Sequence, residues 1–299
     1  MSAIGVGLVL AVAASVALNT GYLLQHQGSS GAPAITPLRP LATLRSLLAS
    51  RVWVGGLVLG TLGWAMHVGA LARAPLSLVQ AFVAGGLALA VPIGRRLFHQ
   101  VLSGGELLGI AVMALALAGL AAGISADGSG GEFDPLELGV FLGLLATLAL
   151  LLALLPSGAR RPQALGLAGG ALYGAADVAI KALTGVGHRH GLGNALLSPW
   201  LAIALLATIG AFFCFQRGLQ SGRALPVIAL MTAATNALSI LAGFVVFGDA
   251  LGATPGLAVL HVVSLATVVA GAALLSGTQT LSGATGGRPA PASQPTTAA

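Results

Sequence analysis

Two ionisable residues, Asp177 and Lys181, stand four positions apart inside a long apolar segment. Lys181 is the only lysine of the chain, and Asp177 is the only acidic residue well inside such a segment. An ionisable residue within a bilayer is costly, so its presence is by default a hypothesis of function. Because positions i and i+4 share one face of a helix, we expect these side chains to neutralise each other. They either form a gate or coupling pair or only lock two helices together.

Small residues accompany this pair at regular spacing. Gly166, Gly170 and Gly174 follow one another at four-residue steps on the same predicted helix. Gly56 and Gly60 form a similar ridge in an earlier apolar segment. Small residues at this spacing let two helices approach closely in lipid. The sequence therefore predicts two close-packing helix faces.

The composition indicates a membrane protein. Hydrophobic residues make up 57% of the 299, charged residues only 7%, and the mean hydropathy is +0.97. Soluble domains carry about 25% charged residues, so a soluble fold of this composition would have almost nothing to present to water. We expect an all-α polytopic membrane protein whose main partner is the lipid bilayer.

Several classes of function are disfavoured by what the chain lacks. The net charge of +6 comes from arginines in short loops between apolar segments, where they set orientation, so no nucleic-acid partner is expected. The single cysteine, Cys214, allows no disulfide framework and is expected to pack within a helix. The sequence contains no phosphate-binding glycine loop, paired-cysteine metal site or zinc-protease motif. We therefore expect no enzyme, no cofactor and no metal site.

Nine apolar segments are long enough to cross a bilayer, which takes about 20 residues. They cover approximately residues 3–25, 52–72, 76–97, 105–124, 136–156, 163–184, 199–217, 224–247 and 254–276. Residues 1–124 hold the first four spans, residues 125–160 an acidic outer loop and a bridging span, and residues 161–276 the last four. The tail, residues 277–299, is rich in small and polar residues and is expected to be disordered.

Basic residues concentrate in cytoplasmic loops and so predict orientation. The loops after spans one, three, five and seven, with the tail, hold ten arginines, while the opposite side holds Arg73, Lys181 and Arg189. We expect the N-terminus outside and the C-terminus in the cytoplasm of a plasma (inner) membrane protein. Residues 37–50 are too short and too charged to span, and we expect a cytoplasmic interfacial helix there. A tenth membrane segment at 37–50 is left open.

Polar residues form stripes on two of these spans. The first span carries Ser15, Asn19, Tyr22 and His26 on one helical face, and the eighth carries Thr232, Thr235, Asn236 and Ser239. Such stripes face a watery cavity or form hydrogen bonds between helices. His67 in span two is either a hydrogen-bonded structural residue or a proton-relay group.

The two ends of the chain show a weak internal repeat. Residues 70–80 match residues 218–228 at an offset of 148, and the stripe of the first span falls on that of Asp177 at an offset of 155. The matching halves are five spans apart, an odd number, so they must have opposite orientations in the membrane. Inverted repeats are typical of secondary transporters, whose substrate sites lie near the bilayer midplane between the halves.

Three stretches carry a resemblance to a known family: residues 173–185, residues 216–219 and residues 70–80. They resemble the drug/metabolite transporter (EamA-like) superfamily, and within it the nine-span branch of NIPA-type magnesium transporters. The resemblance implies a transporter that moves a small solute by alternating access. The path is predicted to be lined by Asn19, Tyr22, His26, His67, Gln80, Tyr173, Asp177, Lys181, Gln216 and Asn236.

The identity of the solute stays open between an organic molecule and a cation. Where the NIPA-like branch has lysines at the end of span one, this chain has Gln25, His26 and Gln27. Magnesium prefers oxygen ligands and carboxylates, whereas the membrane interior offers Asp177 alone, so we favour an organic solute. His188 and His190 could bind a metal, but no third ligand is in view, and we expect a solvated outer loop.

Two further classes of function compete with transport. A membrane scaffold without transport would explain the glycine ridges equally well, but it has no need of an inverted repeat. A membrane-embedded enzyme needs a cluster of His, Asp or Glu at matched depth, which the sequence does not show. A homodimer is also left open.

A substitution tests the predicted pair. Asp177→Asn leaves Lys181 uncompensated, at a cost of about 2.5–3.5 kcal/mol for a charge inside a membrane. We expect this variant to abolish transport in proteoliposomes, while a variant with both residues neutral folds normally. Unchanged transport by Asp177→Asn would rule out a functional role.

Overall fold

The computed structural model describes residues 3–36, 38–76, 78–80, 82–83, 103–121, 132–156, 160–249 and 254–264, with positions 93, 96, 158, 266–267 and 270–271. Within these residues every regular element is an α-helix, as expected. The named helices are α1 (Ala3–Ser29), α2 (Pro40–Leu48), α3 (Arg51–Leu71), α5 (Gly104–Ala121), α6 (Pro135–Ala153), α7 (Arg161–His190), α8 (Leu192–Leu196), α9 (Pro199–Ser221) and α10 (Ala224–Val245).

The long helices begin and end close to the predicted apolar segments. Five of the described helices, α1, α3, α6, α9 and α10, are long and apolar enough to cross a bilayer. The glycines of α7, together with Asp177 and Lys181, make this longest helix less apolar, and it is not among the five. Most of the expected third span, part of the ninth and the tail, residues 277–299, lie outside the described residues. Nine spans therefore stay a prediction.

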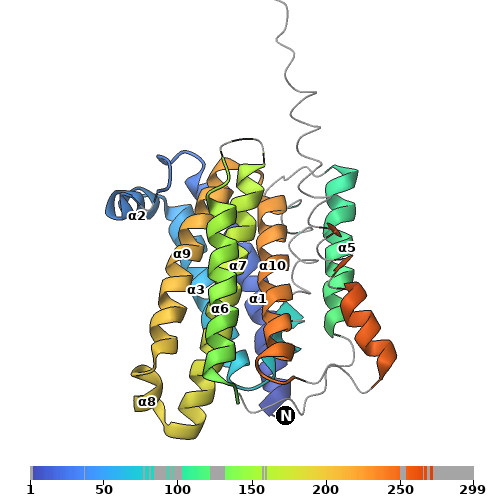
Figure 1. The fold of residues 1–299 in the computed structure, drawn as a ribbon. Helices are drawn as coiled ribbons and strands as arrows, with labels where there is room; N and C mark the ends of the chain where they lie inside the picture. The colour runs from blue at the N-terminus through green and yellow to red at the C-terminus, as the bar shows by residue number, and fades with distance from the viewer. Residues whose placement is uncertain are drawn as a thin grey trace, which may run out of the picture.

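The long helices run side by side as a bundle (Figure 1). α1 packs along α3, while α7 packs against α6, α9 and α10. Most of α7 is therefore buried, whereas α6 and α9 expose Leu144, Leu151 and Leu206 at 64%, 62% and 70%. Extended apolar surface of this kind is rare on soluble monomers. The outer faces of the bundle suit lipid.

Polar residues fix the positions at which three of these helices begin. Ser50, Asp134 and Ser198 precede α3, α6 and α9, and each side chain accepts a hydrogen bond from a backbone N–H of the first turn. Such caps satisfy donors that have no partner within the helix. These capping residues therefore help to determine where α3, α6 and α9 begin.

α2 projects from one end of the bundle (Figure 1). Leu38 and Leu41 are 89% and 82% exposed, whereas Leu47 is fully buried and packs with Trp53 at the start of α3. The helix predicted within residues 37–50 is therefore present. Exposed leucines beside arginines suit the surface of a membrane, and that placement stays a prediction.

One expectation about the loops was wrong. His188, Arg189 and His190 do not lie in a loop but in the last turn of α7, which ends at Gly191. Gly191 has a φ of 84° and a ψ of 164°, a conformation that almost only glycine adopts. Among the described residues no group of three His, Cys, Asp or Glu could hold a metal ion.

Two helix pairs approach closely at glycines. A Cβ added at Gly56 of α3 would lie 2.7 Å from the backbone oxygen of Gly21 in α1. A Cβ added at Gly170 of α7 would lie 2.5 Å from the backbone oxygen of Met231 in α10. Real Cβ atoms essentially never approach a neighbour this closely, so these glycines set the distances between the helices.

We expect Gly56→Ala and Gly170→Ala to lower stability, because each added methyl group meets backbone that cannot move independently of its helix. Overpacking of this kind costs about 1–3 kcal/mol. Gly55→Ala is the matched control, since nothing lies within 4 Å of its added Cβ. The measurement is the midpoint of thermal unfolding in detergent, and equal midpoints for Gly55→Ala and Gly56→Ala would contradict this packing.

Candidate functional site

A cavity of about 70 Å³ lies between α1, α3, α7 and α10, next to Gln80 and Val83. Its lining includes Asn19, Tyr22, Trp64, His67, Gln80, Tyr173, Asp177, Thr232, Thr235 and Asn236. The structure thus brings together most of the residues predicted to line a path. Lys181, His26 and Gln216 do not line it.

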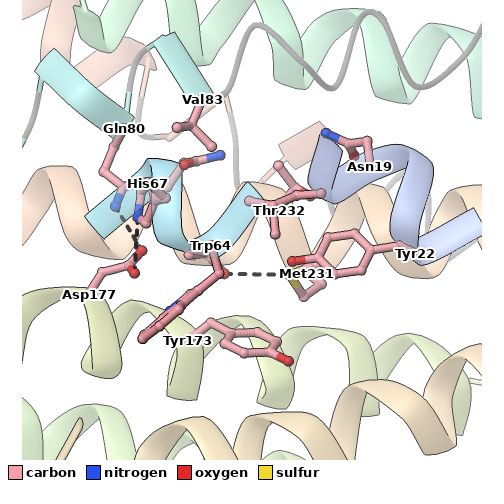
Figure 2. Close-up of a pocket in the computed structure, with 13 residues that line it drawn as sticks. Asn19, Tyr22, Trp64, His67, Gln80, Val83, Tyr173, Asp177, Met231 and Thr232 are labelled. Atoms are coloured by element: carbon pink, nitrogen blue, oxygen red, sulfur yellow. Dashed lines mark hydrogen bonds and ion pairs between the residues drawn. The ribbon is translucent and has the colours of Figure 1, made fainter. Parts of the chain in front are cut away.

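A second cavity of about 290 Å³ adjoins the first. Leu18, Tyr22, Trp64 and Tyr173 line both. The remaining lining of the larger cavity is mainly apolar and comes from α1, α3 and α9. Figure 2 shows Asp177, His67 and Gln80 together at one end of the small cavity, with Tyr22 and Asn19 at the other. The small cavity is therefore the more polar of the two, and the larger cavity beside it is mainly apolar.

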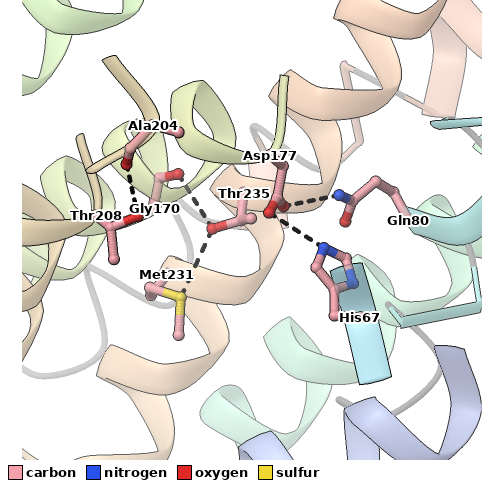
Figure 3. Close-up of polar contacts among 8 residues, drawn as sticks. All are labelled: His67, Gln80, Gly170, Asp177, Ala204, Thr208, Met231 and Thr235. Carbon is pink, nitrogen blue, oxygen red and sulfur yellow. Dashed lines mark hydrogen bonds and ion pairs between the residues drawn. The ribbon is translucent and has the colours of Figure 1, made fainter. Parts of the chain in front are cut away.

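The carboxylate of Asp177 is held by two other elements (Figure 3). Its Oδ1 lies 3.1 Å from Nε2 of His67 on α3, and its Oδ2 accepts a hydrogen bond of 2.8 Å from Nε2 of Gln80. All three residues are buried. An ionised carboxylate only accepts hydrogen bonds, so His67 donates from Nε2 in this arrangement. Asp177 thereby joins α3, α7 and the segment that contains Gln80.

The expected ion pair between Asp177 and Lys181 is not formed. Lys181 Nζ instead donates to the backbone oxygens of Leu71 and Ala74, at 3.3 and 3.1 Å. The last carbonyl groups of a helix have no partner within it, and lysine commonly binds them. Lys181 therefore ties α7 to the end of α3 and leaves the carboxylate to His67 and Gln80.

Several buried polar atoms of the small cavity have no hydrogen-bond partner in the described part of the chain. They are Oδ1 of Asn19, Nδ1 of His67, Oε1 of Gln80 and both side-chain polar atoms of Asn236. Leaving such groups unpaired costs about 1–3 kcal/mol each, and most buried groups in proteins are paired. A set of unpaired atoms that line one cavity is available to a polar ligand.

The four residues of the first-span stripe make different contacts. Ser15 Oγ donates to the backbone oxygen of Val83, at 2.7 Å, while Asn19 and Tyr22 line the cavity. His26 Nδ1 lies 2.9 Å from the backbone oxygen of Leu219, outside it. The stripe therefore contributes both to the lining of a cavity and to hydrogen bonds with neighbouring segments.

Gln216 belongs to a separate polar contact between α1, α3 and α9. Its amide donates to Gln25 and accepts a bond of 3.3 Å from Nε1 of Trp53. Trp64, in contrast, lines both cavities and was not predicted. Its position three residues before His67, and so on the same helical face, was the available signal.

The apolar helices and the polar cavity they enclose define an integral membrane protein. The chain is similar to the protein named "Probable magnesium transporter NIPA9" of Arabidopsis thaliana, with 26% identity over 287 residues. The match covers 90% of this chain and 81% of that protein. No protein-family model matches the chain, and no solved structure matches it.

Double-mutant cycles test which residue holds Asp177. We expect His67→Ala and Asp177→Asn to show a coupling energy of about 1–2 kcal/mol, since they share a charge-assisted hydrogen bond inside the membrane. Lys181→Met and Asp177→Asn should show less than about 0.5 kcal/mol, because the two residues share no contact. Unfolding in mixed SDS micelles measures both cycles, and the opposite order of the two energies would contradict the observed pairing.

Proposed function

We propose that this protein is a membrane transporter of the drug/metabolite type, which moves a small solute by alternating access through the cavity beside Asp177. The observation that supports the proposal most directly is this buried acidic residue, which lines a polar cavity between apolar helices. Intramembrane ionisable residues that face a cavity commonly mark substrate or ion pathways.

The position of the cavity also fits the proposed inverted repeat. α1 and α3 belong to the first proposed half, and α7 and α10 belong to the second. Transporters built from inverted repeats bind substrate between their halves. The contacts of Asp177 with His67 and Gln80, and of Lys181 with the end of α3, cross that same boundary. A rocking motion of the halves would break and remake them.

An ion pair is consistent with the proposed orientation, in which the N-terminus lies outside and the C-terminus in the cytoplasm. Glu106 at the start of α5 pairs with Arg223, which precedes α10. The loops after spans three and seven are both proposed to be cytoplasmic, so this contact joins two elements at one membrane surface. Glu106 is fully buried, and the ion pair with Arg223 balances its negative charge.

Magnesium, or another divalent cation, is the second candidate solute. It is favoured by the name of the similar Arabidopsis protein. The unpaired oxygens of Asn19, Gln80 and Asn236 would add ligands of the type that Mg²⁺ accepts. Against it stand His67 and Gln80, which already bind the two oxygens of the Asp177 carboxylate, because Mg²⁺ needs such oxygens in near-ideal octahedral geometry. We therefore keep an organic solute as the main proposal.

Flux into proteoliposomes that contain the full chain tests the proposal. The panel holds magnesium, amino acids, other metabolites and cationic drugs. We expect flux of one solute class, reduced to the background of empty vesicles by Asp177→Asn. Glu137→Gln is the matched control, because it neutralises an exposed acid on α6 away from the cavity.

The pattern of flux separates the candidates. Organic-solute flux that depends on Asp177 supports the main proposal, and magnesium flux with the same dependence supports the second candidate. Flux that is equal in Asp177→Asn and Glu137→Gln would contradict a role for the cavity. No flux across the panel from folded protein would contradict transport.

A further inference from the structure

Among the described residues that line the small cavity, the only basic group near the Asp177 carboxylate is the imidazole of His67. Among the described residues that line the two cavities, Asp177 is the only acid, and no lysine or arginine is present. Lys181 binds backbone oxygens of Leu71 and Ala74 instead. His67 and Gln80 supply hydrogen bonds to the carboxylate. A buried carboxylate in a medium of low polarity strongly favours a cation beside it.

Aromatic rings line the region that the two cavities share. Tyr22, Trp64 and Tyr173 line both cavities (Figure 2). Phe215 packs edge-to-face against two of these rings, with its ring centroid 4.9 Å from that of Tyr22 and 6.3 Å from that of Tyr173. The face of such a ring attracts an organic cation through its quadrupole, and tryptophan does so most strongly. These rings therefore add attraction for a positive group beyond that of the carboxylate.

The larger cavity indicates what the cation is attached to. A mainly apolar cavity of about 290 Å³ adjoins the small cavity that Asp177 lines, and its own lining includes Leu57, Leu205 and Phe212. A hydrated inorganic ion gains nothing from an apolar wall, whereas a hydrocarbon group gains about 25 cal/mol for each Å² removed from water. The apolar lining of the larger cavity therefore distinguishes an organic cation from a metal ion.

We infer that the joined cavities bind a small organic ammonium ion, with its charged head beside Asp177 and its apolar group against Trp64 and the larger cavity. This inference rests on the proposed function and names the substrate class of the same site. The unpaired oxygens of Asn19 and Asn236 line the same cavity, and their partial negative charge favours a positive head group.

The rim of the larger cavity indicates a route of entry. Trp64 and Leu205 are 44% and 55% exposed on α3 and α9, two helices apolar enough to cross the bilayer. These two lining residues therefore reach the outer surface of the bundle, which suits lipid. A ligand with a hydrocarbon group can partition into the bilayer and reach the carboxylate from there.

Equilibrium binding of radiolabelled benzyltrimethylammonium to the full chain in nanodiscs tests the inference. The probe combines a permanent positive charge with an aromatic group. We expect saturable binding that Asp177→Asn abolishes and that phenylmethanesulfonate, a similar molecule of opposite charge, does not displace. Tetramethylammonium, which has no apolar group, should bind more weakly.

A pair of tryptophan variants provides the internal control. Trp64→Leu removes the aromatic face but keeps an apolar side chain, and should weaken binding about tenfold, within the range of one cation–π contact. Trp200→Leu should leave binding unchanged, because Trp200 packs on Phe133, with ring centroids 5.6 Å apart, and lines neither cavity. If Asp177→Asn does not fold, as judged by size exclusion, this pair decides the question.

Other outcomes overturn the inference. They are an absence of saturable binding by folded wild-type protein, equal affinity of Trp64→Leu and Trp200→Leu, or a phospholipid that native mass spectrometry finds and the probe does not displace. Flux of another solute that depends on Asp177, without binding of the probe, overturns the inference and leaves the proposed function standing. Binding of the probe without flux of any solute supports the inference and contradicts transport.

Discussion

The buried carboxylate of Asp177 is the interaction on which the rest of the structure depends. Its two oxygens bind His67 and Gln80, so one side chain holds α7 to α3 and to the segment that follows α3. Charge in a membrane interior must be paired or must serve a ligand. Here the two neighbours supply hydrogen bonds, and the charge faces a cavity lined by aromatic and amide side chains. The same contacts that stabilise the bundle also prepare the site.

Glycine and lysine make this geometry accessible. Gly170 brings α7 against α10, and Gly56 brings α3 against α1, so four helices can surround a small cavity. Lys181 binds the carbonyl oxygens of Leu71, the last residue of α3, and of Ala74 just beyond it, and so holds the end of α3 against α7. The cavity wall is therefore made of close helix contacts, while its polar lining stays partly unpaired.

Much of the fold could be predicted from the sequence because apolar runs and capping residues are local signals. Asn19 and Tyr22, two residues of the first-span stripe, line the cavity. The partner of Lys181 could not be predicted in this way. The rule for positions i and i+4 considers one helix, whereas the competing carbonyl groups of Leu71 and Ala74 approach only in the folded bundle. Trp64 was missed because an aromatic residue on an apolar helix is usually ordinary packing.

The central claim is that the cavity beside Asp177 lies on a path between the two sides of the membrane. Labelling of Asn236→Cys in a Cys214→Ala background, with a water-soluble thiol reagent added from either side, tests it most directly. Asn236 lines the cavity, whereas Ala233 on the same helix packs with Ile110 and Met113 of α5, so Ala233→Cys is the control. We predict labelling of position 236 from both sides and none of position 233. Labelling of position 236 from one side only, or from neither side, would contradict the account.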